Sequence, residues 1–182
     1  MRKFPAILLL FLVLPVFAAR ADVADGVRAY DAGWYEEALA EFLPAAEAGD
    51  VQAQMALASM YQVGEGVAQS DREAFRWTRA AAERGDPVAQ INLSQFLAAG
   101  RGVARDAAES YFWLLLAANQ GNDWASARLE PAAARLTAAD AENEKARTAN
   151  WSPLGDDLSG SPRVIDGQTL IVDGRRLRLE GI

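Results

Sequence analysis

Apolar residues recur at helical spacing through the middle of the chain. One set with four-residue spacing shares a face of a predicted helix: Ala53, Leu57 and Tyr61. A second set shares a face of the following helix: Ala74, Trp77, Ala80 and Ala81. The pattern therefore predicts pairs of amphipathic helices.

The pattern repeats after 36 residues, so that Leu57 is matched by Leu93 and Trp77 by Trp113. This offset predicts two full units, residues 51–86 and 87–122, with an atypical first unit at 22–50 and a cap at 123–150. A single helical hairpin cannot bury its apolar face, so we expect the units to stack into a mainly α-helical solenoid.

Boundary signals agree with these units. Glycine follows three predicted helices, at Gly49, Gly85 and Gly121, and a capping residue comes next, at Asp50, Asp86 and Asn122. The segments Ser70 to Glu73 and Asp106 to Glu109 each place an acid three residues after an N-cap. This spacing predicts a reciprocal pair of capping hydrogen bonds.

The order of residues within one unit resembles the Sel1-like repeat, a relative of the tetratricopeptide repeat. The matching positions are Leu57, Tyr61, Gly64, Gly66, Val67 and Trp77, then Leu93, Gly100, Gly102, Val103 and Trp113. Leu97 replaces the tyrosine in the second unit. The resemblance covers roughly residues 22–150 and implies a right-handed superhelix that binds proteins or peptides on its concave face.

Polar positions on the first helix of each unit are candidate partner contacts: Gln54, Gln62, Gln90, Asn92 and Gln95. The alternative for them is an ordinary solvated face. Two tryptophans near predicted helix junctions, Trp34 and Trp124, are candidate interface anchors, with packing as the alternative.

The N-terminus has the three parts of a secretory signal peptide. Arg2 and Lys3 precede an apolar run at residues 6–17, and Ala19 to Ala21 supply a small-residue cleavage site. The apolar run is shorter than the roughly 20 residues that span a bilayer. We therefore expect cleavage after Ala21, export to a bacterial periplasm and no membrane association afterwards.

Helical periodicity is lost after Trp151, where residues 151–162 read as a linker and residues 163–182 as three short strands. This last segment resembles the opening of staphylococcal-nuclease-like domains at Asp166, Thr169 and Arg178. The resemblance implies a calcium ligand at the position of Gln168, and the family's next motif, Asp-x-Pro-Glu, does not follow. It is interpreted as an inactive remnant: a truncated reading frame, a degenerate domain docked on the array, or a dangling segment.

Composition and charge exclude several kinds of catalytic site, metal site and binding partner. The sequence has no histidine and no cysteine, which excludes the usual catalytic triads, disulfides and zinc sites, and we expect no cofactor and no metal. Residues 22–150 carry a formal charge of −9, which disfavours nucleic acid and favours basic or neutral peptides. The sequence thus predicts an exported, non-catalytic scaffold for protein or peptide binding. The alternative is a truncated or degenerate calcium-dependent nuclease-related exported protein with a repeat adaptor.

Overall fold

The computed structural model describes residues 22–154 and the backbone of three short strands between residues 163 and 178. The predicted signal peptide and residues 155–162 of the predicted linker lie outside the described residues. The helices of the described part are α1 Val23–Asp31, α2 Tyr35–Glu47, α3 Val51–Val63, α4 Asp71–Glu83, α5 Pro87–Ala99, α6 Ala107–Asn119, α7 Asp123–Ser126, α8 Leu129–Ala133 and α9 Ala138–Ala149. The strands are β1 Arg163–Asp166, β2 Thr169–Val172 and β3 Arg175–Arg178.

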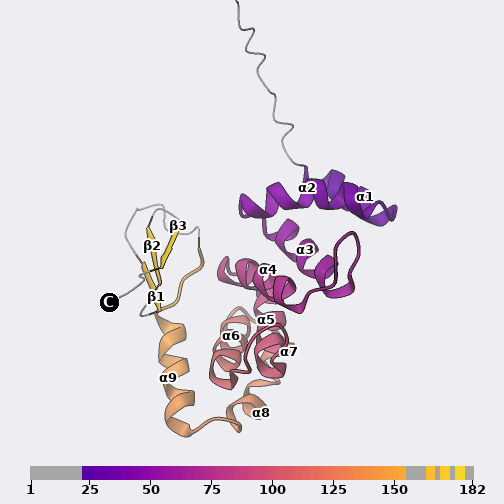
Figure 1. The fold of residues 1–182 in the computed structure, drawn as a ribbon. Helices are drawn as coiled ribbons and strands as arrows, with labels where there is room; N and C mark the ends of the chain where they lie inside the picture. Colours follow the sequence, from indigo (N-terminus) through magenta and orange to yellow (C-terminus); the bar gives the residue numbers. More distant parts are fainter. Residues whose placement is uncertain (1–21, 155–162, 167–168, 173–174, 179–182) are drawn as a thin grey trace, which may run out of the picture.

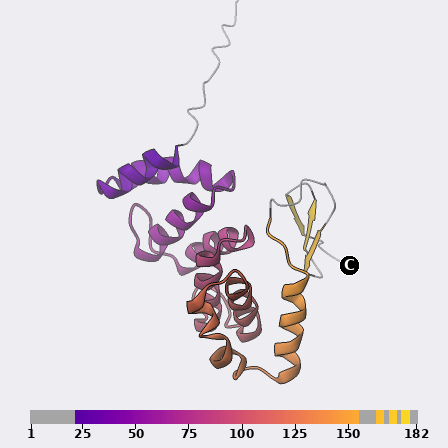
Figure 2. The ribbon, with the colours of Figure 1, turned by 180° about the vertical axis from the view of Figure 1, so that it is seen from behind.

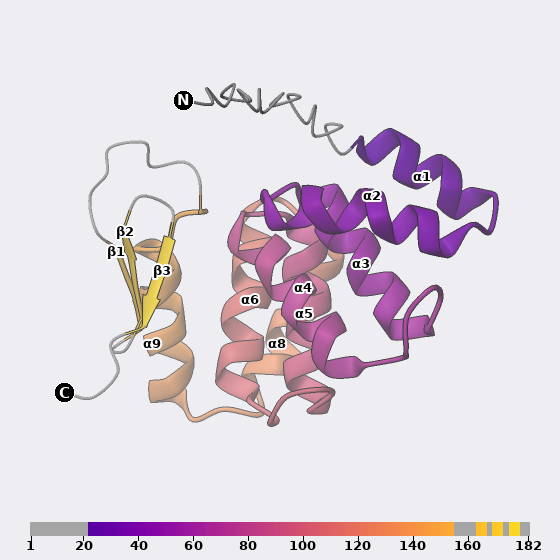
Figure 3. The same ribbon diagram turned by 45° about the horizontal axis from the view of Figure 1, so that its top comes forward.

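The first six helices form three antiparallel hairpins that stack in chain order, each helix packing against the next (Figures 1 and 3). This arrangement confirms the predicted helical-hairpin solenoid. Small side chains allow the close approach, because alanines such as Ala53, Ala81 and Ala89 are completely buried between helices. Leu57 and Leu93 are also fully buried, each contributing about 1.5–3 kcal/mol of hydrophobic stabilisation.

The helix starts follow the predicted caps, with one correction. The Asp50 carboxylate accepts a hydrogen bond from the Ala53 N–H at 2.8 Å, and Ser70 Oγ accepts from the Glu73 N–H at 3.2 Å. The second predicted capping bond, in which the Glu73 carboxylate would accept from the Ser70 N–H, is wrong. The Ser70 N–H donates instead to the Tyr61 carbonyl at 2.8 Å. The second repeat shows the same substitution, with the Asp106 N–H bonded to the Leu97 carbonyl at 3.0 Å.

Each full unit has a connector between its two helices, at residues 64–70 and 100–106, and the second glycine of this connector brings neighbouring units into backbone contact. Gly66 and Gly102 adopt left-handed backbone angles, φ 69° and 65°. A Cβ atom on Gly66 would lie 2.8 Å from the Tyr35 Cβ, and one on Gly102 would overlap the Asp71 carbonyl. Each glycine therefore sits against the first residue of the second helix in the preceding hairpin.

A fourth hairpin begins after Asn122 and is interrupted. Asn122 caps α7 by accepting from the Ala125 N–H at 3.0 Å, as expected for a new unit, but α7 ends at Ser126. Pro131 has no N–H to donate to the Ala127 carbonyl, so a continuous helix would lose a bond there, and α8 starts instead. The cap region is thus two short helices followed by α9.

The helix α9 and the residues after it turn back along the array, on the side of α6 (Figures 1 and 2). Ala141 of α9 is buried, so this helix of the predicted cap packs one of its faces. The Trp151 ring meets Trp113 edge to face at 6.1 Å, and the Leu154 N–H donates to the Glu83 carbonyl at 2.7 Å. Residues 151–154 of the predicted linker therefore pack on the helices.

The three strands form an antiparallel sheet in the order β1-β2-β3. Val172 pairs with Arg175 across β2 and β3, as expected for a hairpin with a two-residue loop. Within the described residues, no helix is both long and apolar enough to cross a membrane.

Candidate functional site

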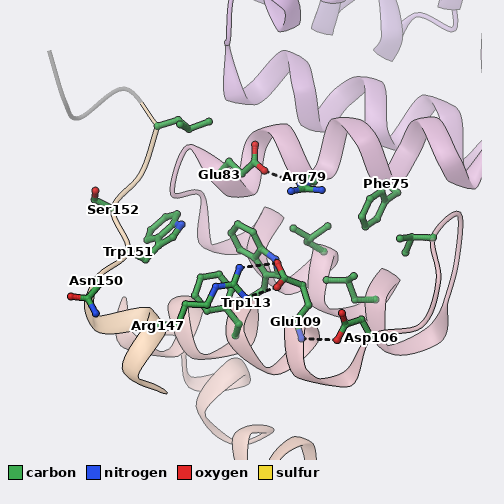
Figure 4. A pocket seen from close by; sticks show the side chains of 15 residues that line it. Phe75, Arg79, Glu83, Asp106, Glu109, Trp113, Arg147, Asn150, Trp151 and Ser152 are labelled. Carbon is green, nitrogen blue, oxygen red and sulfur yellow. Dashed lines mark hydrogen bonds and ion pairs between the residues drawn. The ribbon is translucent and has the colours of Figure 1, made fainter. Parts of the chain in front are cut away.

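A hollow of about 710 Å³ lies between the second helices of the two full units and the end of α9 (Figure 4). We call it the α4–α6 groove. Its walls come from Phe75, Arg79 and Glu83 of α4, from Asp106, Glu109, Phe112 and Trp113 at the start and along the length of α6, and from Arg147, Trp151 and Leu154 of the returning chain. Helical spacing places these side chains in the groove, because Phe75, Arg79 and Glu83 are four residues apart on one face of α4.

The floor of the groove is apolar. Leu93 and Leu97 of α5 and Val103 of the connector line it from below. The Phe112 and Trp113 rings meet edge to face at 5.2 Å, and both are almost fully buried. This floor can accept an apolar side chain of a partner.

A charged network fixes one wall. Arg147 donates to Glu109 at 2.5 Å and to Glu144 at 3.2 Å, and its guanidinium lies 3.8 Å from the centre of the Phe112 ring. Glu109 also accepts from the Trp113 indole N–H at 2.8 Å, and Figure 4 shows these side chains converging. Burial raises the pKa of Glu144. Burial alone would lower the pKa of Arg147, but the hydrogen bonds and charges of its two glutamates outweigh it and raise that pKa.

A second hollow of about 620 Å³ continues the groove along α4, sharing Phe75, Arg79, Glu83 and Leu154 with the first. Four arginines and two glutamates line it: Arg72, Arg76, Arg79, Arg84, Glu73 and Glu83. Arg76 pairs with Glu73 and Arg79 with Glu83, each at 2.8 Å. Paired charges at the edge and apolar residues at the floor make this surface able to hold an extended peptide.

The sequence of the hairpins that form the groove matches the Sel1 repeat family at residues 51–86 and 87–122. The chain carries two Sel1 repeats. They correspond to the hairpins α3–α4 and α5–α6.

Solved structures and a curated protein share this similarity. The Sel1 repeat protein from Oxalobacter formigenes is 32% identical with a TM-score of 0.57, over 70% of this chain and 54% of that one. A protective antigen of uropathogenic Escherichia coli with an SLR fold is 26% identical with a TM-score of 0.61, over 68% of this chain and 27% of that one. An exopolysaccharide production negative regulator of Rhizobium meliloti is 45% identical over 51 residues, 28% of this chain and 19% of the regulator. The chain thus spans about half or less of the length of each of these three proteins.

Two of the predicted contact residues serve the Sel1 repeats internally. Gln54 and Gln90 are 3% and 0% exposed. Their side-chain amides donate to carbonyls near the end of the preceding helix, Ala46 at 3.0 Å and Ala82 at 3.3 Å. Their prediction as partner contacts is wrong in this structure, because each glutamine is buried against the preceding helix end. There its amide is a further donor to a carbonyl that also accepts the N–H of Gly49 or Gly85 at 3.0 Å.

The other predicted contact residues remain accessible and are dispersed. Gln62 and Asn92 are half-buried, Gln95 is exposed, and Trp34 and Trp124 are 63% and 40% exposed. Gln95 and Trp124 line one further hollow, between α5, α6 and the short helices α7 and α8, whereas Trp34 caps α2 near the other end of the array. Partner contact by these residues stays a prediction.

Sequence reasoning missed the groove residues on the second helices of the Sel1 repeats. The sequence did contain a signal for them. Arg79, Glu83 and Glu109 interrupt otherwise apolar helix faces, and a buried face contains charged residues only when they are paired. Among the described side chains, no cluster of acids could hold a metal ion. The side chains of the predicted nuclease-like residues Asp166, Thr169 and Arg178 lie outside the described part, and that resemblance stays a prediction.

Proposed function

We propose that this chain is an exported, non-catalytic scaffold that binds a peptide segment of another protein in the α4–α6 groove. One observation carries the proposal. The chain's own segment, residues 151–154, already lies along this groove as part of its wall, with an aromatic side chain packed on Trp113 and a main-chain N–H bonded to the Glu83 carbonyl. The same two kinds of contact would hold a peptide from a partner.

The stacked Sel1 repeats support a binding role because each hairpin extends an open surface instead of enclosing a reaction site. The apolar floor suits one or two apolar side chains, and the ion pairs along α4 and α6 suit a peptide of mixed charge.

Photocrosslinking in the host tests the site. A photoreactive amino acid replaces Arg76, which is exposed in the second hollow that continues the groove. In a matched control it replaces Val88, which is 55% exposed and lines neither hollow. We expect a discrete crosslinked partner from position 76 and none from position 88. The affinity of the purified partner should then fall in Trp113→Ala. Equal crosslinking from both positions would contradict a specific groove.

Export is part of the same proposal and rests on the charged, apolar and small-residue parts of residues 1–21. Cell fractionation should place the protein in the periplasm, and N-terminal sequencing should begin at Asp22. Recovery of the protein with Met1 intact in the cytoplasm would refute it.

The nuclease-like resemblance of residues 163–182 receives no catalytic role in this proposal. Gln168 offers an amide where the family pattern has a calcium-binding carboxylate, and an amide oxygen binds a hard dication far more weakly. Calcium-dependent DNA cleavage that disappears in Arg178→Ala would overturn the non-catalytic assignment.

A further inference from the structure

A third hollow of about 410 Å³ lies outside the groove, on the side of the array where the fourth hairpin is interrupted. We call it the arginine hollow. It is lined by Ser94, Gln95, Ala98, Arg105, Ala107, Ser110, Leu114, Trp124, Arg128, Pro131, Ala132 and Arg135. The hollow exists because α7 stops at Ser126, after four residues, whereas the equivalent helices α3 and α5 each have 13.

The lining of the arginine hollow contains three arginines and no acid. This is unusual in a region whose residues 22–150 carry a formal charge of −9. Of the eleven lysines and arginines in residues 22–154, six form ion pairs, and the other five have no acidic partner among the described side chains. Three of those five lie here: Arg105, Arg128 and Arg135. All three are exposed and can reach a ligand.

The rest of the lining is apolar or aromatic. Leu114 is 4% exposed and forms part of the floor with Ala98 and Ala132. The Arg128 guanidinium lies 3.5 Å from the centre of the Trp124 ring and donates to the Trp124 carbonyl at 3.1 Å. Stacking on Trp124 fixes the Arg128 guanidinium in place, and most of its N–H groups are left to donate to a ligand. A guanidinium held in this way is preorganised to bind a carboxylate.

We propose that the arginine hollow binds an acidic peptide segment, whose carboxylates meet Arg105, Arg128 and Arg135 and whose apolar side chain lies on Trp124 and Leu114. The charge of the whole array selects this ligand over long polyanions. A nucleic acid or an anionic membrane would be repelled by the surrounding net charge of −9, whereas a short acidic segment fits within the positive area. This site is separate from the α4–α6 groove, so it does not depend on the function proposed there.

The test uses a fluorescent peptide that alternates glutamate with leucine, and anisotropy on the full chain at low ionic strength. Arg105→Gln combined with Arg135→Gln should weaken binding about a hundredfold, since removing each arginine–carboxylate pair should cost about tenfold, which corresponds to 1.4 kcal/mol. The matched control is Arg28→Gln combined with Lys145→Gln, which changes the net charge equally at two exposed side chains that line none of the three hollows. The control should bind within about threefold of the unmodified chain, because it retains every side chain that lines the hollow.

Three further measurements separate the alternatives. The same peptide with glutamine in place of glutamate should not bind, and Trp124→Ala should weaken binding of the acidic peptide. Equal losses in the two double variants would show unspecific charge attraction and overturn the site. Full competition by millimolar succinate would show a pocket for small carboxylates and overturn the peptide assignment.

Discussion

Alanine in place of Gly102 tests how the two Sel1 repeats are joined. Gly102 has φ 65°, and a Cβ atom there would overlap the Asp71 carbonyl and lie 2.6 Å from the Arg72 nitrogen. These are backbone atoms at the start of α4, so no side-chain rotation can relieve the overlap. The two hairpins must move apart or the connector must change its path.

The size of the effect has two parts. A left-handed alanine costs about 1–2 kcal/mol, whatever surrounds it. Forcing an extra atom into a packed contact adds about 1–3 kcal/mol. Gly102→Ala should therefore lower the free energy of unfolding by about 2–5 kcal/mol, a large part of the roughly 5–15 kcal/mol typical of a folded protein.

Gly121→Ala is the matched control. Gly121 also has a left-handed backbone, φ 84°, but nothing lies within 4 Å of the position of its Cβ. Urea unfolding of the full chain, followed by far-ultraviolet circular dichroism, should show only the conformational cost of about 1–2 kcal/mol for this variant. If the two variants differ by less than about 0.5 kcal/mol, the scale of ordinary surface substitutions, the connector contact does not hold the repeats together.

Three further measurements follow from the side-chain network. Trp113→Phe should cost about 1–2 kcal/mol more than Trp77→Phe in urea unfolding, because the Trp113 indole donates to a glutamate and the Trp77 indole has no partner; equal costs would contradict this. Gln90→Met should lower stability by about 1–3 kcal/mol, because it removes two hydrogen bonds, one to the Ala82 carbonyl, which keeps the Gly85 N–H, and one from the Gln120 amide; an unchanged unfolding midpoint would refute that role. The hydrogen bond from Tyr30 to Glu65, and then burial, raise the pKa of Tyr30 above its ordinary 10.0. Its stabilisation is therefore complete below pH 10 and lost as pH rises through the folded-state pKa, so the stability difference from Tyr30→Phe should shrink above pH 10; a constant difference would contradict this assignment.

The features that sequence predicted well are those encoded within a few residues. The left-handed glycines and the caps at Asp50 and Asp86 depend only on neighbouring backbone groups, so their spacing was sufficient. The 36-residue offset predicted the hairpins because the buried alanines and tryptophans recur with it.

The features that sequence did not predict depend on contacts between distant residues. Gln54 and Gln90 occupy positions that a solvated helix face would also fill with glutamine, and only the stacked helix end explains their burial. The predicted bond from the Ser70 N–H to the Glu73 carboxylate is absent because the Ser70 N–H donates to the carbonyl of Tyr61, nine residues earlier. The α4–α6 groove joins Phe75 to Leu154, a separation that no local pattern reports.

The bond from the Leu154 N–H to the Glu83 carbonyl alters how the array should come apart. In an open solenoid each unit contacts only its neighbours. The terminal unit therefore unfolds first, and the free energy of this local opening is close to the interaction free energy of its single interface. Here the segment after α9 reaches back past the α5–α6 hairpin to α4, and the bond joins residues 71 positions apart in the chain. Loss of the last helices is thereby coupled to α4, and hydrogen exchange in α5 and α6 should report one cooperative opening instead of a gradient toward the C-terminus. A chain built from short-range repeats thus acquires a long-range contact, which can form only when residue 154 has reached α4.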